Sequence, residues 1–483
     1  MPERDELLGA AWGRRRRIGL FTGPVLFAAL LALPAPEGLA PAGWRTAAVG
    51  VLMAVWWVTE AIPIPATSLL PIVLLPILGA ASIDVVATPY ANPLLFLFLG
   101  GFLLALAIER WGLHRRLALN VIDRVGTGPA RLLAGFMGSA ALISMWVSNT
   151  ATTLMLLPIA LSVVEWITAD DDASHVPSGF AAALMLGIAY AASIGGLGTL
   201  IGTPPNALVG GFLRETYGID VGFARWMMVG VPVVVVTIPI AYVILLRSHR
   251  IGGVATMAGR DRIAAELSAL GRMSRAEKAV GVVFALTALA WVTRPLLERW
   301  ISGITDAGIA IAGALLLFVL PSGRTRGEFV LDWSTARRVP WGILILFGGG
   351  LSLAAAIEAT GLAEWLGHAM GGVETWSLVA ILLAVAVVVV FFSELASNTA
   401  TAATFLPIAG ALALALGLDP LVLAIPTGMA ASGGFMLPVA TAPNAIVYAS
   451  GSITMSQMAR AGFLLDLAFV IVVTVACWTL VPL

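Results

Sequence analysis

The sequence has few of the charged residues that give a soluble protein its hydrated surface. Only 11% of its 483 residues are charged, against about 25% in an average soluble domain. Hydrophobic residues make up 59%, and the mean hydropathy is +0.98. Apolar stretches recur from end to end, and several reach the roughly 20 residues of a membrane-spanning helix. The composition excludes a soluble protein and predicts an all-α polytopic protein of the inner (cytoplasmic) membrane, embedded in the lipid bilayer.

Cysteine and histidine are also scarce. The single cysteine, Cys477, lies in the last apolar stretch, which excludes intrachain disulfides and thiolate metal sites. The four histidines are scattered without metal-ligand spacing: His114, His175, His249 and His368. No catalytic constellation occurs within the apolar stretches, and no basic stripe interleaved with aromatic residues indicates a nucleic-acid partner. We expect neither an enzyme nor a cofactor-dependent protein.

Basic residues near the N-terminus predict how the chain enters the membrane. Arg14 to Arg17 precede an apolar run that Pro34 and Pro36 end without an obvious small-residue cleavage site, unlike a secretory signal peptide. Because basic residues stay on the cytoplasmic side of a membrane, we predict a cytoplasmic N-terminus. The C-terminus is expected outside.

The chain is built from two related halves. Residues 98–113 match residues 347–362, and Ser148-Asn149-Thr150 matches Ser397-Asn398-Thr399 at the same offset of 249 residues. Identical polar triplets in register with a matched Glu, Gly and Pro are not a chance property of apolar helices. A basic linker separates the halves, with seven arginine and lysine residues between 247 and 278. We predict a basic segment and first helix (1–44), a first repeat (45–246), a cytoplasmic linker (247–278) and a second repeat (279–483).

The charges of the two halves predict that they are inverted across the membrane. The polar segment at 110–131 holds five arginines, whereas its counterpart at 358–376 holds no arginine or lysine and three glutamates. The same segment should therefore face the cytoplasm in one half and the outside in the other. Inverted repeats are a common construction among secondary transporters.

Each half contains apolar segments interrupted by polar residues. Residues 131–147 and 151–165 are about 15 to 17 residues long, or roughly 22 to 26 Å of helix, which is short of the about 30 Å hydrocarbon core. Together with 376–396 and 400–416, they predict two re-entrant hairpins with the triplets at their tips. Thr203-Pro-Pro-Asn206 and Thr441-Ala-Pro-Asn444, at an offset of 238, break two further helices. Broken segments at matching positions indicate a transporter's binding site.

The residue types at the tips suit both an anion and a cation. Ser, Asn and Thr begin helices, so each tip should direct free N–H groups and a positive dipole end into a cavity. The amides of Asn149 and Asn398 and the hydroxyls of Thr150 and Thr399 add donors for carboxylates. Serine hydroxyls and half-helix carbonyls would suit sodium. A single such triplet more often forms hydrogen bonds between neighbouring membrane helices. Two triplets in register, each beside a broken helix, favour a ligand-binding site.

In these motifs the sequence resembles the divalent anion/sodium symporter family, which includes the sodium–dicarboxylate cotransporters. Residues 56–63 and the Gly202-Thr-Pro-Pro-Asn206 loop belong to the same resemblance, which covers most of the chain. It implies about eleven transmembrane helices with two opposed hairpins, a homodimer held by a scaffold domain, and elevator-type movement. Two departures stand out: Ser393 occupies a position where threonine is expected, and Ala442 replaces the first proline of the second loop.

The resemblance also implies the ligands. One sodium site would use Ser144, Ser148, Asn149 and the Gly202 carbonyl, and the other Ser393, Ser397, Asn398 and the Ala440 carbonyl. The substrate would contact Ser148, Asn149, Thr150, Ser397, Asn398, Thr399, Thr203 and Thr441.

The function implied is sodium-coupled symport of small divalent anions such as succinate, malate or fumarate. A sodium-independent dicarboxylate exchanger and a carrier of an inorganic oxyanion such as sulfate remain alternatives within the family. An intramembrane enzyme and a channel are alternatives from other classes. The residues leave the role of Glu394, next to Ser393, open between tuning of cation binding and structural hydrogen bonding.

Overall fold

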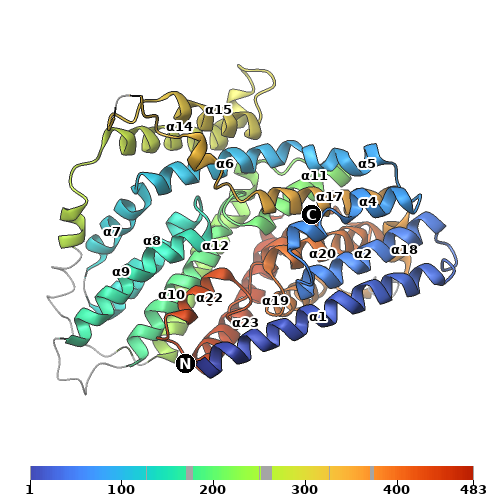
Figure 1. Cartoon of the computed structure of the whole chain (residues 1–483), viewed down its shortest axis with the longest axis horizontal. Helices are drawn as coiled ribbons and strands as arrows, with labels where there is room; N and C mark the ends of the chain where they lie inside the picture. The colour runs from blue at the N-terminus through green and yellow to red at the C-terminus, as the bar shows by residue number, and fades with distance from the viewer. Residues whose placement is uncertain are drawn as a thin grey trace.

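The computed structural model describes residues 2–126, 128–169, 178–249, 251, 264–325, 327–369 and 375–481. These residues form an almost wholly helical protein, whose one β pairing in the described ranges is an isolated bridge between Pro321 and Phe329. Figure 1 shows long helices running side by side, many of them oblique to the longest axis, with α14 and α15 along the upper edge of that view. The predicted all-α class is confirmed.

The first half holds helices on both sides of its hairpin. They are α1 (Pro2–Ala32), α2 (Pro41–Thr59), α3 (Ile64–Thr67), α4 (Leu70–Ile77), α5 (Ile83–Ala87), the 3-10 helix η1 (Thr88–Ala91), α6 (Pro93–Arg110), α7 (Leu113–Val125), α8 (Pro129–Ser144), α9 (Asn149–Ala169), α10 (Ser178–Gly196), α11 (Pro204–Tyr217) and α12 (Phe223–Ser248).

The helices from α14 onward belong to the second half of the chain. Its helices are α14 (Arg275–Leu297), α15 (Asp306–Val319), α16 (Trp333–Ala336), α17 (Trp341–Ala359), α18 (Leu362–Ala369), α19 (Leu378–Ser393), α20 (Asn398–Ala415), α21 (Leu421–Ala430), α22 (Ala442–Ala449) and α23 (Met455–Leu480).

Length and hydropathy identify membrane-spanning elements. Seven helices in the described part of the chain are long and apolar enough to cross a bilayer, and six shorter apolar helices of 10–17 residues accompany them. The short ones include α8 and α19, the first arms of the two predicted hairpins. The second arm of the first hairpin, α9, has 21 residues and is longer than the sequence indicates. The second arm of the second hairpin, α20, has 18 residues. The chain is a multi-pass membrane protein.

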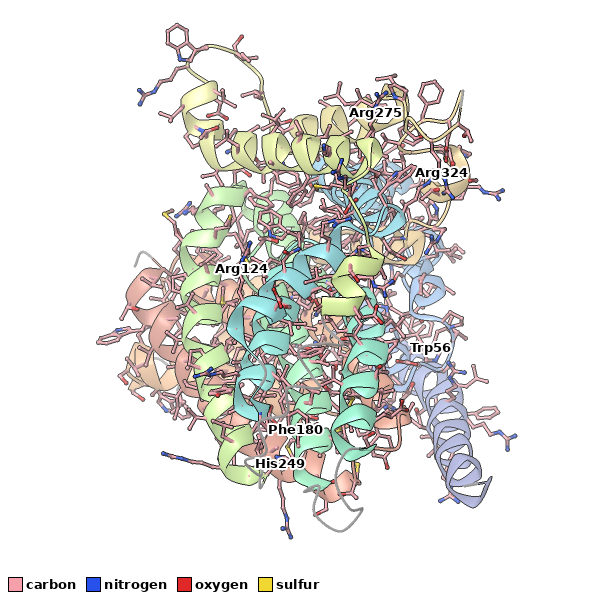
Figure 2. The ribbon with its side chains drawn as sticks, turned by 90° about the vertical axis from the view of Figure 1, so that its left-hand side faces the viewer. Trp56, Arg124, Phe180, His249, Arg275 and Arg324 are labelled. Carbon is pink, nitrogen blue, oxygen red and sulfur yellow. The ribbon has the colours of Figure 1, made fainter. Side chains whose placement is uncertain are left out.

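A basic residue at the end of a spanning helix binds a loop of the second half. At the end of α6, Arg110 Nη1 lies 2.6 Å from Asp332 of the loop before α16. The Ser334 hydroxyl and the Thr335 N–H, both bonded to this carboxylate, hold the pKa of Asp332 below its usual range, so it stays ionised beside Arg110. Figure 2 shows Arg275 and Arg324 close together at the top of that view. A methyl group on Gly323 would lie 2.9 Å from Arg275 Cδ, so the end of the predicted linker lies beside the loop that follows α15.

The hairpins and broken helices of the two halves pack crosswise. The second arm of the first hairpin, α9, packs against α22 of the second half, and α20 packs against α11 of the first half. α10 also packs against α22, and α11 against α21. The second arm of each hairpin therefore packs against the helix that follows the broken segment of the other half.

Candidate functional site

The first tip is the turn between α8 and α9. α8 ends at Ser144 and α9 begins at Asn149. The Ser148 hydroxyl accepts a hydrogen bond from the Ala151 N–H at 3.2 Å and caps α9. A half-helix therefore starts at the triplet, as the sequence predicts, and the positive end of its dipole lies at the tip. Ser148 is exposed, and Asn149 and Thr150 are half-buried, so a ligand can reach them.

Three of the predicted sodium ligands meet beside this tip. The buried Ser144 hydroxyl donates to Asn149 Oδ1 at 2.6 Å, which leaves its own lone pairs free for a cation. A methyl group placed on Gly196 would lie 2.7 Å from Asn149 Oδ1 and 3.2 Å from the Gly202 carbonyl oxygen. Asn149 and Gly202, 53 positions apart, therefore converge on the end of α10. Glycine is needed at 196 because a side chain would fill the space between them.

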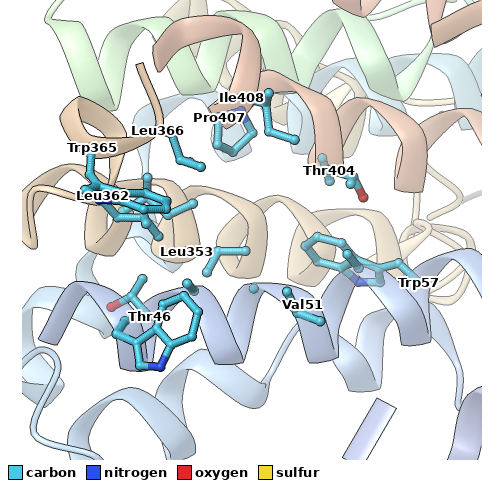
Figure 3. Close-up of a pocket in the computed structure, with 16 residues that line it drawn as sticks. Thr46, Val51, Trp57, Leu353, Leu362, Trp365, Leu366, Thr404, Pro407 and Ile408 are labelled. Carbon is cyan, nitrogen blue, oxygen red and sulfur yellow. The ribbon is translucent and has the colours of Figure 1, made fainter. Parts of the chain in front are cut away.

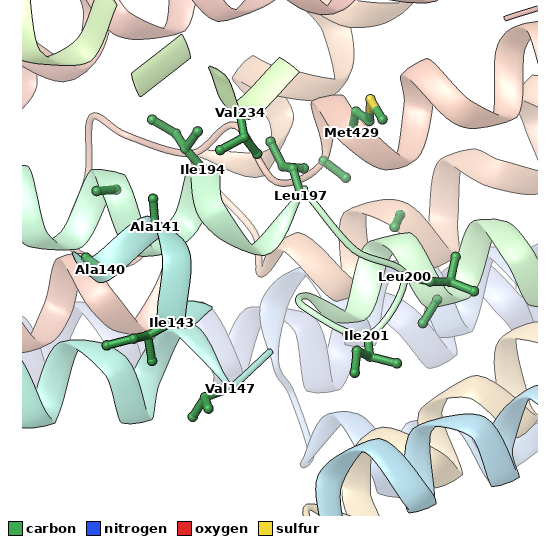
Figure 4. Packing of buried hydrophobic residues seen from close by; sticks show 14 of the residues in the cluster. Ala140, Ala141, Ile143, Val147, Ile194, Leu197, Leu200, Ile201, Val234 and Met429 are labelled. Atoms are coloured by element: carbon green, nitrogen blue, oxygen red, sulfur yellow. The ribbon is translucent and has the colours of Figure 1, made fainter. Parts of the chain in front are cut away.

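Figure 4 shows the surroundings of this convergence. The backbone between Leu197 and Ile201 forms an irregular loop that lies between the end of α8, with Ile143, and the helices of the second half, with Met429. Leu197, Leu200 and Ile201 are buried. Apolar side chains thus surround the loop. Its Leu197 carbonyl accepts from the Trp226 indole N–H at 2.9 Å, and its Thr199 carbonyl accepts from the Asn206 amide at 2.7 Å.

The second tip repeats the construction. α19 ends at Ser393, α20 begins at Asn398, and the Ser397 hydroxyl accepts from the Ala400 N–H at 3.2 Å. A methyl group on Gly434 would lie 2.9 Å from Ala440 Cβ and 3.5 Å from Ser393 Oγ, so these residues also converge. Asn398 Oδ1 is buried and has no hydrogen-bond partner among the described residues. An acceptor in that state is suited to a cation or to a donor on the substrate.

The two threonines that precede the broken helices differ. Thr441 caps α22, since its hydroxyl accepts from the Asn444 N–H at 3.2 Å, whereas the Thr203 side chain makes no cap bond to α11. Their backbones are nevertheless alike, with φ −144° and ψ 145° at Thr203 and φ −138° and ψ 150° at Thr441. Replacement of a proline by Ala442 therefore leaves the N-cap geometry of the second loop intact. The helix that follows is shorter, at 8 residues against 14.

Glu394 has a defined structural contact. It is 3% exposed, and its carboxylate accepts hydrogen bonds from the N–H groups of Met436 at 2.7 Å and Leu437 at 2.9 Å. At the matching place in the first half, the Met145 carbonyl accepts from the Thr199 hydroxyl at 2.5 Å. Both contacts attach a tip turn to the interrupted loop of the same half. Of the two roles left open by the sequence, hydrogen bonding is the one these contacts provide.

One pocket among the described residues does not suit an anion. A cavity of about 270 Å³ lies between α2, α17, α18 and α20, and Figure 3 shows Trp57, Leu353 and Trp365 on its walls. Its two threonine hydroxyls, Thr46 and Thr404, donate to carbonyls of their own helices. No donor points into it, so the tips, not this cavity, are the candidate substrate site.

Two buried asparagines of the site were not singled out by the sequence. Asn206 and Asn444 end the two matched motifs, and each side-chain amide bonds to the loop that precedes it. Their identical place in both motifs was the signal available. The local pattern does not reveal a bond that reaches back seven to ten residues across a broken helix.

Capped hairpin tips beside broken helices, within a bundle of apolar spans, define a secondary transporter. Two solved structures share the fold: the YdaH transporter of Alcanivorax borkumensis (TM-score 0.59, 17% identity, 89% of this chain and 98% of that chain) and Neisseria gonorrhoeae MtrF (TM-score 0.58, 15% identity, 94% and 97%).

The sequence comparisons identify the family. The profile described as "Sodium:sulfate symporter transmembrane region" matches residues 15–483. The sodium-dependent dicarboxylate transporter SdcS of Staphylococcus saprophyticus is 42% identical over 473 residues, covering 96% of this chain and 91% of that protein. SdcS of Staphylococcus aureus strain USA300 is 42% identical over 474 residues with the same coverage. The chain belongs to this symporter family, as its motifs predict, and is a transporter, not an enzyme.

Proposed function

We propose that this protein is a sodium-coupled symporter of C4-dicarboxylates such as succinate, malate and fumarate. The observation that carries the proposal is the pair of tips, each of which begins with a capped helix start. Oxygens of Ser144, Asn149 and Gly202 gather beside the first tip, and Ser393 meets Ala440 beside the second. The helix starts suit the two carboxylates of the substrate. The clustered hydroxyl and carbonyl oxygens suit sodium, a hard cation. The name of the SdcS relatives supports the same substrate and the same ion.

The residues divide between the two ligands. Ser144, Ser148, Asn149 and the Gly202 carbonyl would hold one sodium ion, and Ser393, Ser397, Asn398 and the Ala440 carbonyl the other. The dicarboxylate would lie between the two triplets, near Thr203 and Thr441. Because Ser144 and Ser393 are buried and the triplets are more accessible, sodium would bind beneath the substrate and order the tips for it.

Alternating access would follow an elevator mechanism in a homodimer. The crosswise packing of α9 on α22 and of α20 on α11 supports movement of the two hairpins and broken helices as one body. The inverted halves, a cytoplasmic N-terminus and an outside C-terminus complete the proposed topology.

Uptake into proteoliposomes tests the proposal. With radiolabelled succinate outside, an inward sodium gradient should drive accumulation, and replacement of sodium by potassium should reduce it to the level of empty liposomes. Preloaded unlabelled succinate should give saturable counterflow, which a channel does not. Uptake that is indifferent to sodium but needs succinate inside would assign the protein to exchange instead.

Sulfate is the second candidate substrate, because the matching profile is that of sodium:sulfate symporters. The same helix starts could hold a tetrahedral dianion. Unlabelled sulfate in excess should leave succinate uptake unchanged if the dicarboxylate assignment is right. If sodium instead drives uptake of labelled sulfate, and succinate inhibits that uptake only weakly, sulfate is the substrate and the dicarboxylate assignment is wrong.

A further inference from the structure

Two asparagines occupy the same position in the two halves and make the same contacts. Asn206 Nδ2 donates to the carbonyl oxygens of Gly196 at 2.9 Å and Thr199 at 2.7 Å. Asn444 Nδ2 donates to the carbonyl oxygens of Gly434 and Leu437, both at 3.1 Å. Donors and acceptors are each 238 positions apart. Both side chains are wholly buried. We call each asparagine, together with the two loop carbonyls that its amide binds, a clamp. The same clamp thus occurs twice in the chain.

Each clamp holds the glycine around which the sodium ligands gather. A methyl group on Gly202 would lie 2.3 Å from the Gly196 carbonyl oxygen, so the Gly202 backbone rests directly on the residue that Asn206 fixes. A methyl group on Gly196 itself would also lie 2.7 Å from Asn149 Oδ1, so Asn149 packs against this glycine as well. In the second half, Gly434 lies between the Asn444 amide and the Ser393–Ala440 pair.

Asparagine is the side chain that this geometry requires. One planar amide nitrogen carries two N–H donors and can bridge two carbonyls at once, whereas a hydroxyl has one donor and a carboxylate has none. The amide oxygens of both Asn206 and Asn444 are buried without a partner among the described residues. An unpaired buried acceptor is unfavourable for folding. Because both positions tolerate one, the two hydrogen bonds that each amide donates must outweigh the cost of its unpaired oxygen.

We propose that Asn206 and Asn444 are positioning residues of the two sodium sites. By fixing Gly196 and Gly434, they hold the carbonyl-bearing loops at the spacing that a cation needs, and so set the affinity for sodium without contacting it. This inference rests on the proposed sodium coupling and extends it to residues outside the two ligand sets.

Alanine substitution tests the role. Asn206→Ala and Asn444→Ala should each raise the sodium concentration for half-maximal succinate uptake about tenfold, equivalent to roughly 1.4 kcal/mol, with uptake recovering at high sodium. Sodium should also stabilise each variant less than the wild type in thermal unfolding without substrate. The matched control is Asn120→Ala on α7, whose amide likewise donates to a backbone carbonyl, that of Arg116, at 2.7 Å.

A second pair of variants covers the case in which alanine prevents folding. Asn206→Ser and Asn444→Ser keep one donor and should give a smaller shift in the same direction. If the serine variants unfold at a lower temperature than the wild type and yet respond to sodium as it does, the role of the asparagines is merely structural. That result would overturn this inference but not the proposed sodium coupling. A wild-type protein whose uptake and melting both ignore sodium would instead overturn the proposed coupling ion, and this inference with it.

Discussion

At the scale of single residues, the two tips are similar in their ligands and different in their supports. Ser148 and Ser397 cap their helices in the same way. The support behind each tip is neutral in the first half, where a hydroxyl bonds to the Met145 carbonyl, and is a buried carboxylate in the second, that of Glu394. The two tips are therefore attached to their loops by different groups, although their proposed ligand types match.

The tip asparagines should be indispensable. Asn149→Ala and Asn398→Ala each remove a ligand oxygen and an amide donor, and the first also leaves the Ser144 hydroxyl without its acceptor. We expect uptake of succinate to fall about a hundredfold or more, with the folded protein still eluting as the wild type does in size-exclusion chromatography. Thr153→Ala and Thr404→Ala serve as controls because their hydroxyls donate to carbonyls of their own helices. Wild-type rates in either asparagine variant would contradict the assignment.

At the scale of elements, the connectors that lead into the two hairpins are attached by different chemistry. α7 joins α6 to the first hairpin, and Arg116 on it bonds to Glu277 and to the carbonyls of Leu270 and Gly271. α18 occupies the matching place in the second half, where the Trp365 indole N–H donates to the Glu37 carbonyl. The first connector thus has an arginine among its attachments, and the second has a tryptophan indole.

Loss of the α7 attachment should destabilise the protein. Arg116→Ala leaves the Glu277 side chain, 7% exposed, as a buried carboxylate without its cation, at a cost of about 3 kcal/mol. Thermal unfolding in detergent should show a clearly lower midpoint. The neighbouring Arg115→Ala is the control, because Arg115 is 44% exposed in its pair with Glu266 and such pairs contribute about 0–1 kcal/mol. Equal shifts in the two variants would mean that burial of Glu277 is not the cause.

At the scale of the whole molecule, the apolar cavity marks a boundary between parts that the elevator proposal assigns to different bodies. α2 and α17 lie on one side of it and α20, the second arm of the second hairpin, on the other. Apolar walls without fixed hydrogen bonds across them allow one side to slide past the other. The cavity is thus suited to a moving interface, while the clamps around the tips keep the binding site rigid.

A covalent link across this cavity should stop transport. In a Cys477→Ala background, which removes the one native thiol, Val51→Cys and Thr404→Cys joined by a cleavable bifunctional reagent should lose succinate uptake and regain it when the linker is cut. Val51→Cys with Leu353→Cys lines the same cavity within the proposed scaffold and should keep its uptake when linked. Full activity of the linked Val51–Thr404 pair would rule out relative movement of these helices.

Much of the architecture and part of the site follow from the sequence. Hydropathy over 20-residue windows, proline breaks and helix caps depend on residues close along the chain, so the membrane class, the hairpin tips and the broken segments could be predicted. The convergence of Asn149 with Gly202 was predicted only through the family resemblance. The Glu394 contacts and the Asn206 and Asn444 clamps could not be predicted. These contacts join residues whose meeting depends on how whole helices pack.

The sequence by itself therefore determined what kind of molecule this is: a helical membrane transporter with two related halves and a polar triplet at each tip. The tertiary structure decided which oxygens stand together. It turned the loops after α10 and α21 back onto the tips, and it set each hairpin beside the broken helix of the other half. A cation needs several oxygens around one point, and a point shared by distant segments exists only once the chain has packed.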